Sequence, residues 1–528
     1  METYKQDVKE QSRELIWQHA VCSLTSNRNS TRILTDDYIK NLWDYIFGKS
    51  KYTNRFFKNK PLPDIGFLNS WHSFAHNIYG CKEPSDLRIA YLCGPEPEND
   101  LNILLRLGLR IENIWAIESD KNTFITALEN VKLQYPTLKI FHGSIDDFFG
   151  VYKLQFDIIY LDFTAPIFSK EAKPFLTIHK IFDDQVLSEL GILITNYSVP
   201  DKNDDSVELL TKFFVDHEYM ESSIYGYRDE NGELQYHFGD GVGAHYGEGN
   251  VKELSKKIYE NFEYAYSAFC SLYPVFYANI ISPEFRVVKE NVLRRKLFND
   301  SDEVIQKYIN KKYENDYSCY QSYPEVGFVD RLSSSKTKLC QYWNNVYSSK
   351  EAGTKFSRTN SVKLAGIIKD ALVEEHISLL SDSLFKSVKN TYAVMKEYEE
   401  SRIFCDILFP NVLIEIALNQ FGIPYHSNFF NHKRYRYTAK VREMFIDIFT
   451  FDKCRAFYDW IPLIEFYDVN LALAERQMIL RSCIDVIGGK QLGFTPIPLY
   501  NSGVNVIGMF EEKWAKFADG FPKRETIE

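Results

Sequence analysis

Small and acidic residues follow four short apolar stretches between residues 87 and 165. In chain order they are Gly94, Glu96, Glu98, Glu118, Ser119, Ser144, Asp146 and Asp162. If each apolar stretch is a strand of one parallel sheet, these residues meet at its carboxyl edge, where such sheets bind ligands. We therefore expect a ligand site there.

The first of these loops carries one glycine, Gly94, and two carboxylates, Glu96 and Glu98. A loop that cradles a pyrophosphate needs further glycines, and carboxylates beside a phosphate are unfavourable. The loop thus disfavours NAD, FAD and ATP and favours a ligand with a cationic centre. Exposed loop charges without a function are the alternative. Asp100 is expected to cap the following helix.

The second and fourth stretches each end in an acid. Glu118 is placed to accept both hydroxyls of a ribose, or else it is a solvated strand-end acid. Asp162 is a candidate general base or positioning carboxylate, or else it caps a turn or helix. Asn196 and Tyr197, after a fifth apolar stretch, either contact an acceptor or pack a loop.

The elements that must position these residues follow from alternating patterns. Apolar stretches predict strands at 87–94, 114–117, 138–141, 156–161 and 191–195, and amphipathic stretches predict helices at 101–109, 121–133 and 182–190. Such alternation predicts βαβ units. The predicted fold class is therefore α/β, with a mainly parallel sheet covered on both faces.

The ordered series of strand-end motifs resembles the class I S-adenosylmethionine-dependent methyltransferase fold over about residues 85–225. The resemblance implies a Rossmann-like domain in which Gly94 is the turn glycine and Glu118 binds ribose. It also implies that Gly143, Ser144 and Ile145 line the adenine, with Asp146 as a substitute adenine acid, and that Asp162 is the acid of the fourth strand. The chain departs from the family in its glycine-poor first loop and in Leu92, where an acid is usual.

The residues outside 85–225 are expected to form three further segments, which differ in composition and residue pattern. At roughly 150 residues per domain, 528 residues predict about three domains. We expect a helical N-terminal segment over 1–84, a glycine-rich hairpin and loop over 226–250, and a mostly α-helical region over 251–528. The glycine-rich loop is either a lid or a connector, and its hairpin turn is predicted at Asn231-Gly232.

Composition excludes several classes of protein. The net charge of −10 argues against a broadly basic nucleic-acid binder. No apolar stretch is long enough to span a membrane, and nine cysteines without a Cys-x-x-Cys pair indicate reduced thiols and a cytoplasmic location. His237 and His245 lack partners at ligand spacing, so no metal is expected.

A local basic and aromatic cluster spans 426–442 and includes Lys433, Arg434 and Arg436. Phosphate pairing and base stacking would suit a nucleic acid, whereas the alternative is a solvated helix face with its rings turned inward. The leading expectation is S-adenosylmethionine-dependent methyl transfer, with nucleic acid as the favoured acceptor. A catalytically inactive binding or scaffold protein and a small-molecule methyltransferase are the alternatives. The oligomeric state and any partner protein are not predicted.

Overall fold

The structure, a computed structural model, describes residues 7–33, 66–225, 227–228, 234–235, 248–289, 298, 301–315, 324–351, 353–364, 381–382, 424–428, 431–439, 442–458 and 524–528. These residues are organised around one nine-stranded sheet. A separate antiparallel pair joins β6 (Tyr227–Arg228) to β7 (Leu234–Gln235). The predicted Asn231-Gly232 turn between them, and the loop with His237 and His245, lie outside the described residues.

Five parallel strands form one half of the main sheet, in the order β3-β2-β1-β4-β5. They are β1 (Ile89–Leu92), β2 (Ile114–Glu118), β3 (Lys139–His142), β4 (Phe156–Asp162) and β5 (Leu187–Ser198). From β1 the chain adds β2 and then β3 on one side. It then crosses back over the sheet and adds β4 and β5 on the other side of β1. This confirms the predicted α/β, Rossmann-like fold with a mainly parallel sheet.

The other half of the sheet comes from the C-terminal part of the chain. The hairpin of β9 (Lys433–Ala439) and β10 (Arg442–Asp452) inserts its second strand antiparallel to β5. β11 (Glu525–Thr526) pairs parallel with β9, and β8 (His426–Ser427) pairs antiparallel with β10. The sheet thus extends well beyond residues 85–225, and the expectation of a helix face in the basic cluster is wrong.

The predicted strands agree with β1 to β5, but the helix predicted at 182–190 is wrong. The helix is α9 (Pro174–Asp183), and β5 already begins at Leu187. Apolar residues do recur at helical spacing across this junction. Gln185, however, adopts a left-handed backbone with φ of 51° and separates the two elements.

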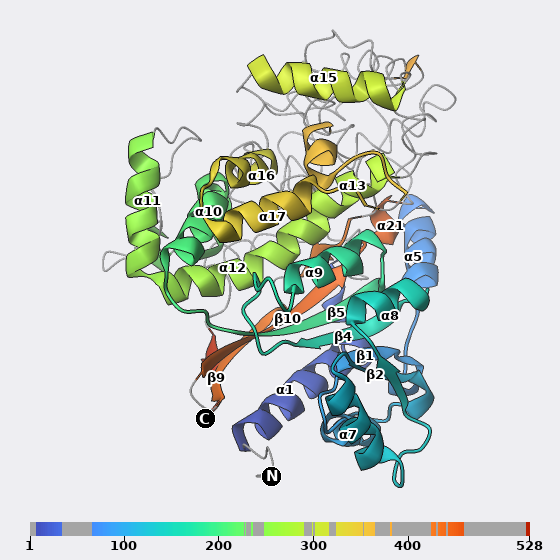
Figure 1. Ribbon diagram of the computed structural model, residues 1–528. Coiled ribbons are helices and arrows are strands. Elements are labelled where there is room, and N and C mark those ends of the chain that lie inside the picture. Colours follow the sequence, from blue (N-terminus) through green and yellow to red (C-terminus); the bar gives the residue numbers. More distant parts are fainter. Residues whose placement is uncertain are drawn as a thin grey trace.

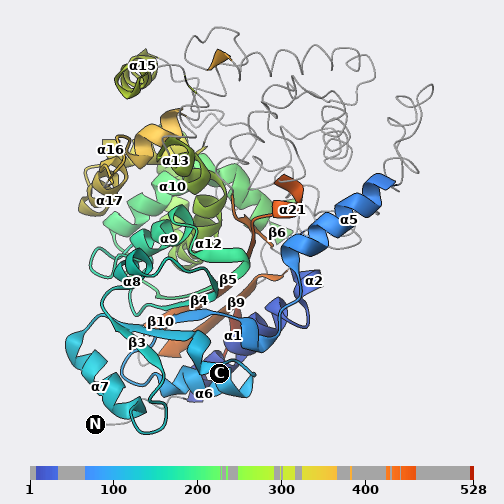
Figure 2. The same ribbon diagram turned by 90° about the vertical axis from the view of Figure 1, so that its right-hand side faces the viewer.

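Helices cover both faces of the sheet, and Figures 1 and 2 show the two layers. One face packs against α1 (Asp7–Leu24), α5 (Gly66–Tyr79), α6 (Glu98–Arg106) and α7 (Lys121–Val131). The other packs against α8 (Ile145–Val151), α9, α10 (Asp204–Tyr225) and α12 (Phe262–Phe276). The strands β1, β2, β4, β5 and β10 therefore contribute alternate side chains to two apolar cores.

The region after β5 is mainly helical where it is described. It contains α11 (Glu248–Glu260), α12, α13 (Ser282–Lys289), α15 (Asp302–Asn315), α16 (Pro324–Ser334) and α17 (Lys338–Ser348). α12 lies against the sheet in Figure 1, and its buried aromatic residues join the larger core. Among the described residues, no helix combines the length and apolarity needed to cross a membrane.

Candidate functional site

The carboxyl ends of β1 and β2 bring two predicted site residues to neighbouring positions. Leu92 pairs with Ile117, so Gly94 follows β1 beside the end of β2, where Glu118 lies. Gly94 has a φ of 61°, and a Cβ at this position would meet no atom within 4 Å. The left-handed backbone explains the glycine. The half-buried Glu118 accepts a hydrogen bond from the Asp120 amide at 2.8 Å, and the next residue, Ser119, is exposed.

The two loop carboxylates lie on the same side of β1. Glu96 accepts a hydrogen bond from Asn99 at 2.9 Å. Glu98 begins α6, and its Oε2 is buried without a hydrogen-bond partner within the described chain. Burial, with the Glu96 charge in addition, raises the pKa of Glu98. The loop therefore presents negative charge and one unsatisfied acceptor, which suits a cationic or donor group.

Of the predicted site residues after β3, one stays at the edge of the sheet and two face the helices α8 and α9. Ser144 caps α8, and its Oγ accepts from the Asp147 amide at 3.1 Å. Ile145 is buried in the larger core. Burial raises the pKa of Asp146, and a hydrogen bond from Thr177 and the charge of Lys180, both on α9, oppose that shift. Asp146 and Ile145 thus engage the α8–α9 side, and Ser144 remains half-buried at the edge.

A polar trio spans the ends of β4, β5 and β9. The side-chain amide of Asn196 donates to Asp162 Oδ1 and to the hydroxyl oxygen of Tyr437, both at 2.7 Å. Asn196 is fully buried, and its Oδ1 has no hydrogen-bond partner within the described chain. Burial and the nearby Asp162 charge raise the pKa of Tyr437. Asp162 is therefore held in place while 13% of its side chain stays exposed.

Tyr197 points away from this trio, because adjacent residues of a strand face opposite sides of the sheet. It is fully buried in the larger core, and its ring stacks on Phe163. The two predicted acceptor contacts thus lie within β5, where Asn196 contacts Asp162 and Tyr197 packs in the core.

The N-terminal helix α1 supplies cationic side chains to the same edge, which sequence reasoning missed. Lys9 Nζ lies 3.3 Å from Asp162 Oδ2, and Arg13 Nε lies 3.4 Å from Asp100 Oδ2. Trp17 Nε1 donates to Asp100 Oδ1 at 2.8 Å, and its ring meets Tyr160 edge-on. These partners are separated by about eighty or more residues of chain, so no local pattern could reveal them.

The expectation that Asp100 caps a helix is wrong. α6 begins at Glu98, so Asp100 lies inside its first turn and is buried. Burial raises the pKa of Asp100, although Arg13 and the Trp17 hydrogen bond oppose the shift. Its carboxylate binds side chains of α1 and does not cap the backbone amides of α6.

The three basic residues predicted to contact nucleic acid occupy different environments on β9. Lys433 is exposed. Arg434 is buried, with Nε 3.4 Å from Asp447 Oδ1 and a hydrogen bond from Nη2 to the Ser267 hydroxyl at 2.9 Å. Arg436 pairs with Glu263 at 3.0 Å and also with Glu443. Of these three residues, Arg434 is therefore withdrawn from the surface, and two glutamates balance the charge of Arg436.

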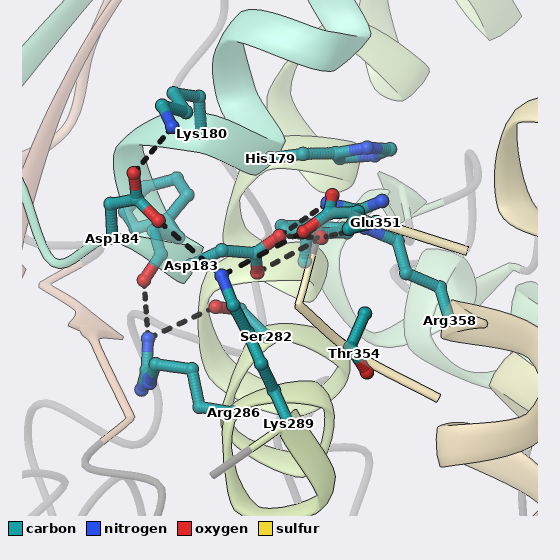
Figure 3. A network of polar contacts seen from close by, with 12 residues as sticks. His179, Lys180, Asp183, Asp184, Ser282, Arg286, Lys289, Glu351, Thr354 and Arg358 are labelled. Atoms are coloured by element: carbon teal, nitrogen blue, oxygen red, sulfur yellow. Dashed lines mark hydrogen bonds and ion pairs between the residues drawn. The ribbon is translucent and has the colours of Figure 1, made fainter. Parts of the chain in front are cut away.

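A second polar network lies at the opposite end of the sheet, between α9, α12, α13 and residues 351–358 (Figure 3). Arg358 donates to Asp183 at 2.6 Å and to the Tyr277 hydroxyl at 2.8 Å. Burial raises the pKa of Asp183, and Arg358 opposes that shift. Lys289 lies 3.6 Å from Asp184 and 3.7 Å from Glu351. Asp183, Asp184 and Glu351 thus each meet a basic side chain, which fits a structural role in holding these helices together.

No protein-family model, curated protein or solved structure matches this chain. Within the described ranges, no group of three His, Cys, Asp or Glu side chains is arranged to hold a metal ion. The candidate site joins the carboxylate-rich loop after β1 and the end of β2 to a hydrogen-bonded acid at the end of β4.

Proposed function

We propose that the chain is an S-adenosylmethionine-dependent methyltransferase whose cofactor binds at the carboxyl edge of the sheet. The observation that carries the proposal is the placement of Gly94, Glu118 and Asp162 at the ends of the three adjacent strands β1, β2 and β4. That is the arrangement which the resemblance to class I methyltransferases implies.

The sheet is also compatible with the Rossmann-like fold that this resemblance implies. Here β10 lies antiparallel to β5, and β9 lies outside it. This hairpin comes from residues 433–452, outside the stretch in which the sequence motifs occur.

The residues at the edge fit the chemistry of this cofactor. The Glu118 carboxylate would accept the ribose hydroxyls, and the open space beside Gly94 lets the ligand approach the backbone. Glu96 and Glu98 would face the positive centres. When bound, S-adenosylmethionine supplies an activated methyl group, so the protein must mainly orient the acceptor. Asp162, fixed by Asn196, would orient the acceptor and take up its proton.

Calorimetric titration with S-adenosylmethionine and S-adenosylhomocysteine tests the proposal. We expect micromolar binding by the full chain and at least tenfold weaker binding by Glu118→Ala, because two hydrogen bonds to a charged group are lost. Glu112→Ala is the matched control, since Glu112 is exposed just before the amino end of β2. No binding by folded protein to either ligand contradicts the proposal.

Two alternatives predict other results with the same protein. A catalytically inactive scaffold binds the cofactor without transferring methyl to any acceptor. A nucleic-acid methyltransferase requires the surface around Lys433 and Arg436, whereas a small-molecule enzyme does not. The cytoplasm is the proposed compartment, on the sequence grounds of unpaired cysteines.

A further inference from the structure

Lys9 lies at the part of the carboxyl edge of the sheet where the methyl acceptor is expected, beside β4 and β5. The proposed cofactor groups lie at the carboxyl ends of β1 and β2, whereas Asp162 and Asn196 lie near the carboxyl ends of β4 and β5, on the other side of β1. Lys9 reaches Asp162 from α1, with Nζ 3.3 Å from Oδ2 and only 20% of its side chain exposed. A primary ammonium group thus occupies the position beside the proposed proton acceptor.

The position of Lys9 is fixed from both directions. On α1, Trp17 and Arg13 bind Asp100 at the start of α6. On the sheet, Asn196 fixes the other oxygen of Asp162 at 2.7 Å. Among the polar groups around this pair, Tyr437 and Arg13 also face Asp162. The carboxylate therefore offers one defined oxygen to an amine.

We propose that the surroundings of Asp162, Asn196 and Tyr437 form a subsite for a primary alkylamine acceptor, and that Lys9 occupies it and is itself a methylation site. This inference rests on the proposed function and goes beyond it by naming the acceptor. A carboxylate suits an alkylammonium group better than the neutral exocyclic amine of a base, because only the former brings a charge to pair with it.

The chemical step balances without a further reactant. The ammonium group first loses a proton to Asp162 or to water. The nitrogen lone pair then forms a bond to the methyl carbon while the carbon–sulfur bond breaks, and its electron pair stays on sulfur. The sulfonium becomes a neutral thioether, and the product is a methylated ammonium. Asp162 acts by pairing with the amine and receiving its proton.

The chain contains a matched pair for comparison. Lys82 Nζ lies 2.5 Å from Asp157 Oδ1, with 31% of the Lys82 side chain exposed. Asp157 is the second residue of β4 and Asp162 is the last, so the two Lys–Asp pairs lie at opposite ends of one strand. Unspecific chemical methylation would modify the more exposed Lys82 at least as readily as Lys9.

Mass spectrometry of the full chain after incubation with isotopically labelled S-adenosylmethionine tests the inference, beside calorimetry of cofactor binding. We expect labelled methyl on Lys9 and none on Lys82. Asp162→Asn should reduce methylation of Lys9 by about 100-fold while cofactor affinity stays unchanged, which also shows that this variant is folded. The Lys9→Ala substitution should leave the subsite free. This variant should therefore methylate added n-butylamine faster than the unaltered chain does.

The two proposals fail in different ways. Cofactor binding without label on Lys9, and without methylation of n-butylamine by Lys9→Ala, overturns the amine subsite and leaves the proposed function standing. Equal labelling of Lys9 and Lys82 also overturns the subsite. Absence of cofactor binding overturns the proposed function and the inference that rests on it.

Discussion

Trp17 donates its indole Nε1 to Asp100 Oδ1 at 2.8 Å and thereby fastens the N-terminal helix α1 to the first turn of α6. Both side chains are buried. Because Lys9 and Arg13 lie on the same helix, this one hydrogen bond fixes the cationic side of the candidate site.

Trp17→Phe should therefore loosen α1. The variant leaves Asp100 Oδ1 without its donor in a buried position, which costs about 1–3 kcal/mol of unfolding free energy. Urea denaturation measures this loss, and hydrogen exchange should show faster exchange of α1 amides than of α7 amides. Unchanged exchange in α1 would show that other contacts hold the helix.

The buried carboxylate of Asp447 should make Arg524 important for stability. Arg524 Nη2 lies 2.5 Å from Asp447 Oδ2 and fastens the terminal strand β11. Burial alone acts to raise the pKa of Asp447, but Arg524, His432 and Arg434 together hold it well below its usual value. Arg524→Ala should lower the unfolding free energy by about 3 kcal/mol.

Arg436→Ala is the control for this prediction, because its pairs with Glu263 and Glu443 are partly exposed. It should cost at most about 1 kcal/mol. Equal losses for the two variants, measured by urea denaturation, would contradict the role assigned to the Asp447 pair.

Acidification should destabilise the fold through buried histidines. Burial lowers the pKa of His426 to about 3 and that of His432 to about 4. Both folded pKa values lie below the unfolded value near 6.5, so the unfolded chain binds protons first. Stability is then lost as the pH falls from about 6.5, by up to about 1.4 kcal/mol per pH unit for each histidine.

His426→Asn isolates one part of this dependence. The variant should reduce the slope of unfolding free energy against pH by about 1.4 kcal/mol per unit between about pH 6 and pH 4. Urea titrations at several pH values provide the measurement. An unaltered slope would mean that His426 titrates normally in the folded chain.

The basic cluster should contribute little to nucleic-acid binding. Arg434 is buried against Asp447, and Arg436 already pairs with two glutamates. Lys433→Ala combined with Arg436→Ala should change the affinity for a single-stranded oligonucleotide less than about threefold at physiological salt. Loss of a strongly salt-dependent interaction in that variant would instead favour nucleic acid as the acceptor.

The parallel half of the sheet and the residues at its carboxyl ends are predictable from the sequence pattern. The apolar stretches before Gly94, Glu118 and Asp162 are buried on both faces, and such strands show as continuous apolar runs. These features depend on neighbours in sequence, so a local pattern suffices.

The side chains that face those residues depend on how the whole chain folds. Lys9 and Asp162, Trp17 and Asp100, and Asn196 and Tyr437 are each brought together from distant parts of the chain. The basic cluster shows the same limit, since its strand pairing with β10 turns Arg434 inward and Lys433 outward. Such contacts follow from strand order and helix packing, which residue spacing along the chain does not encode.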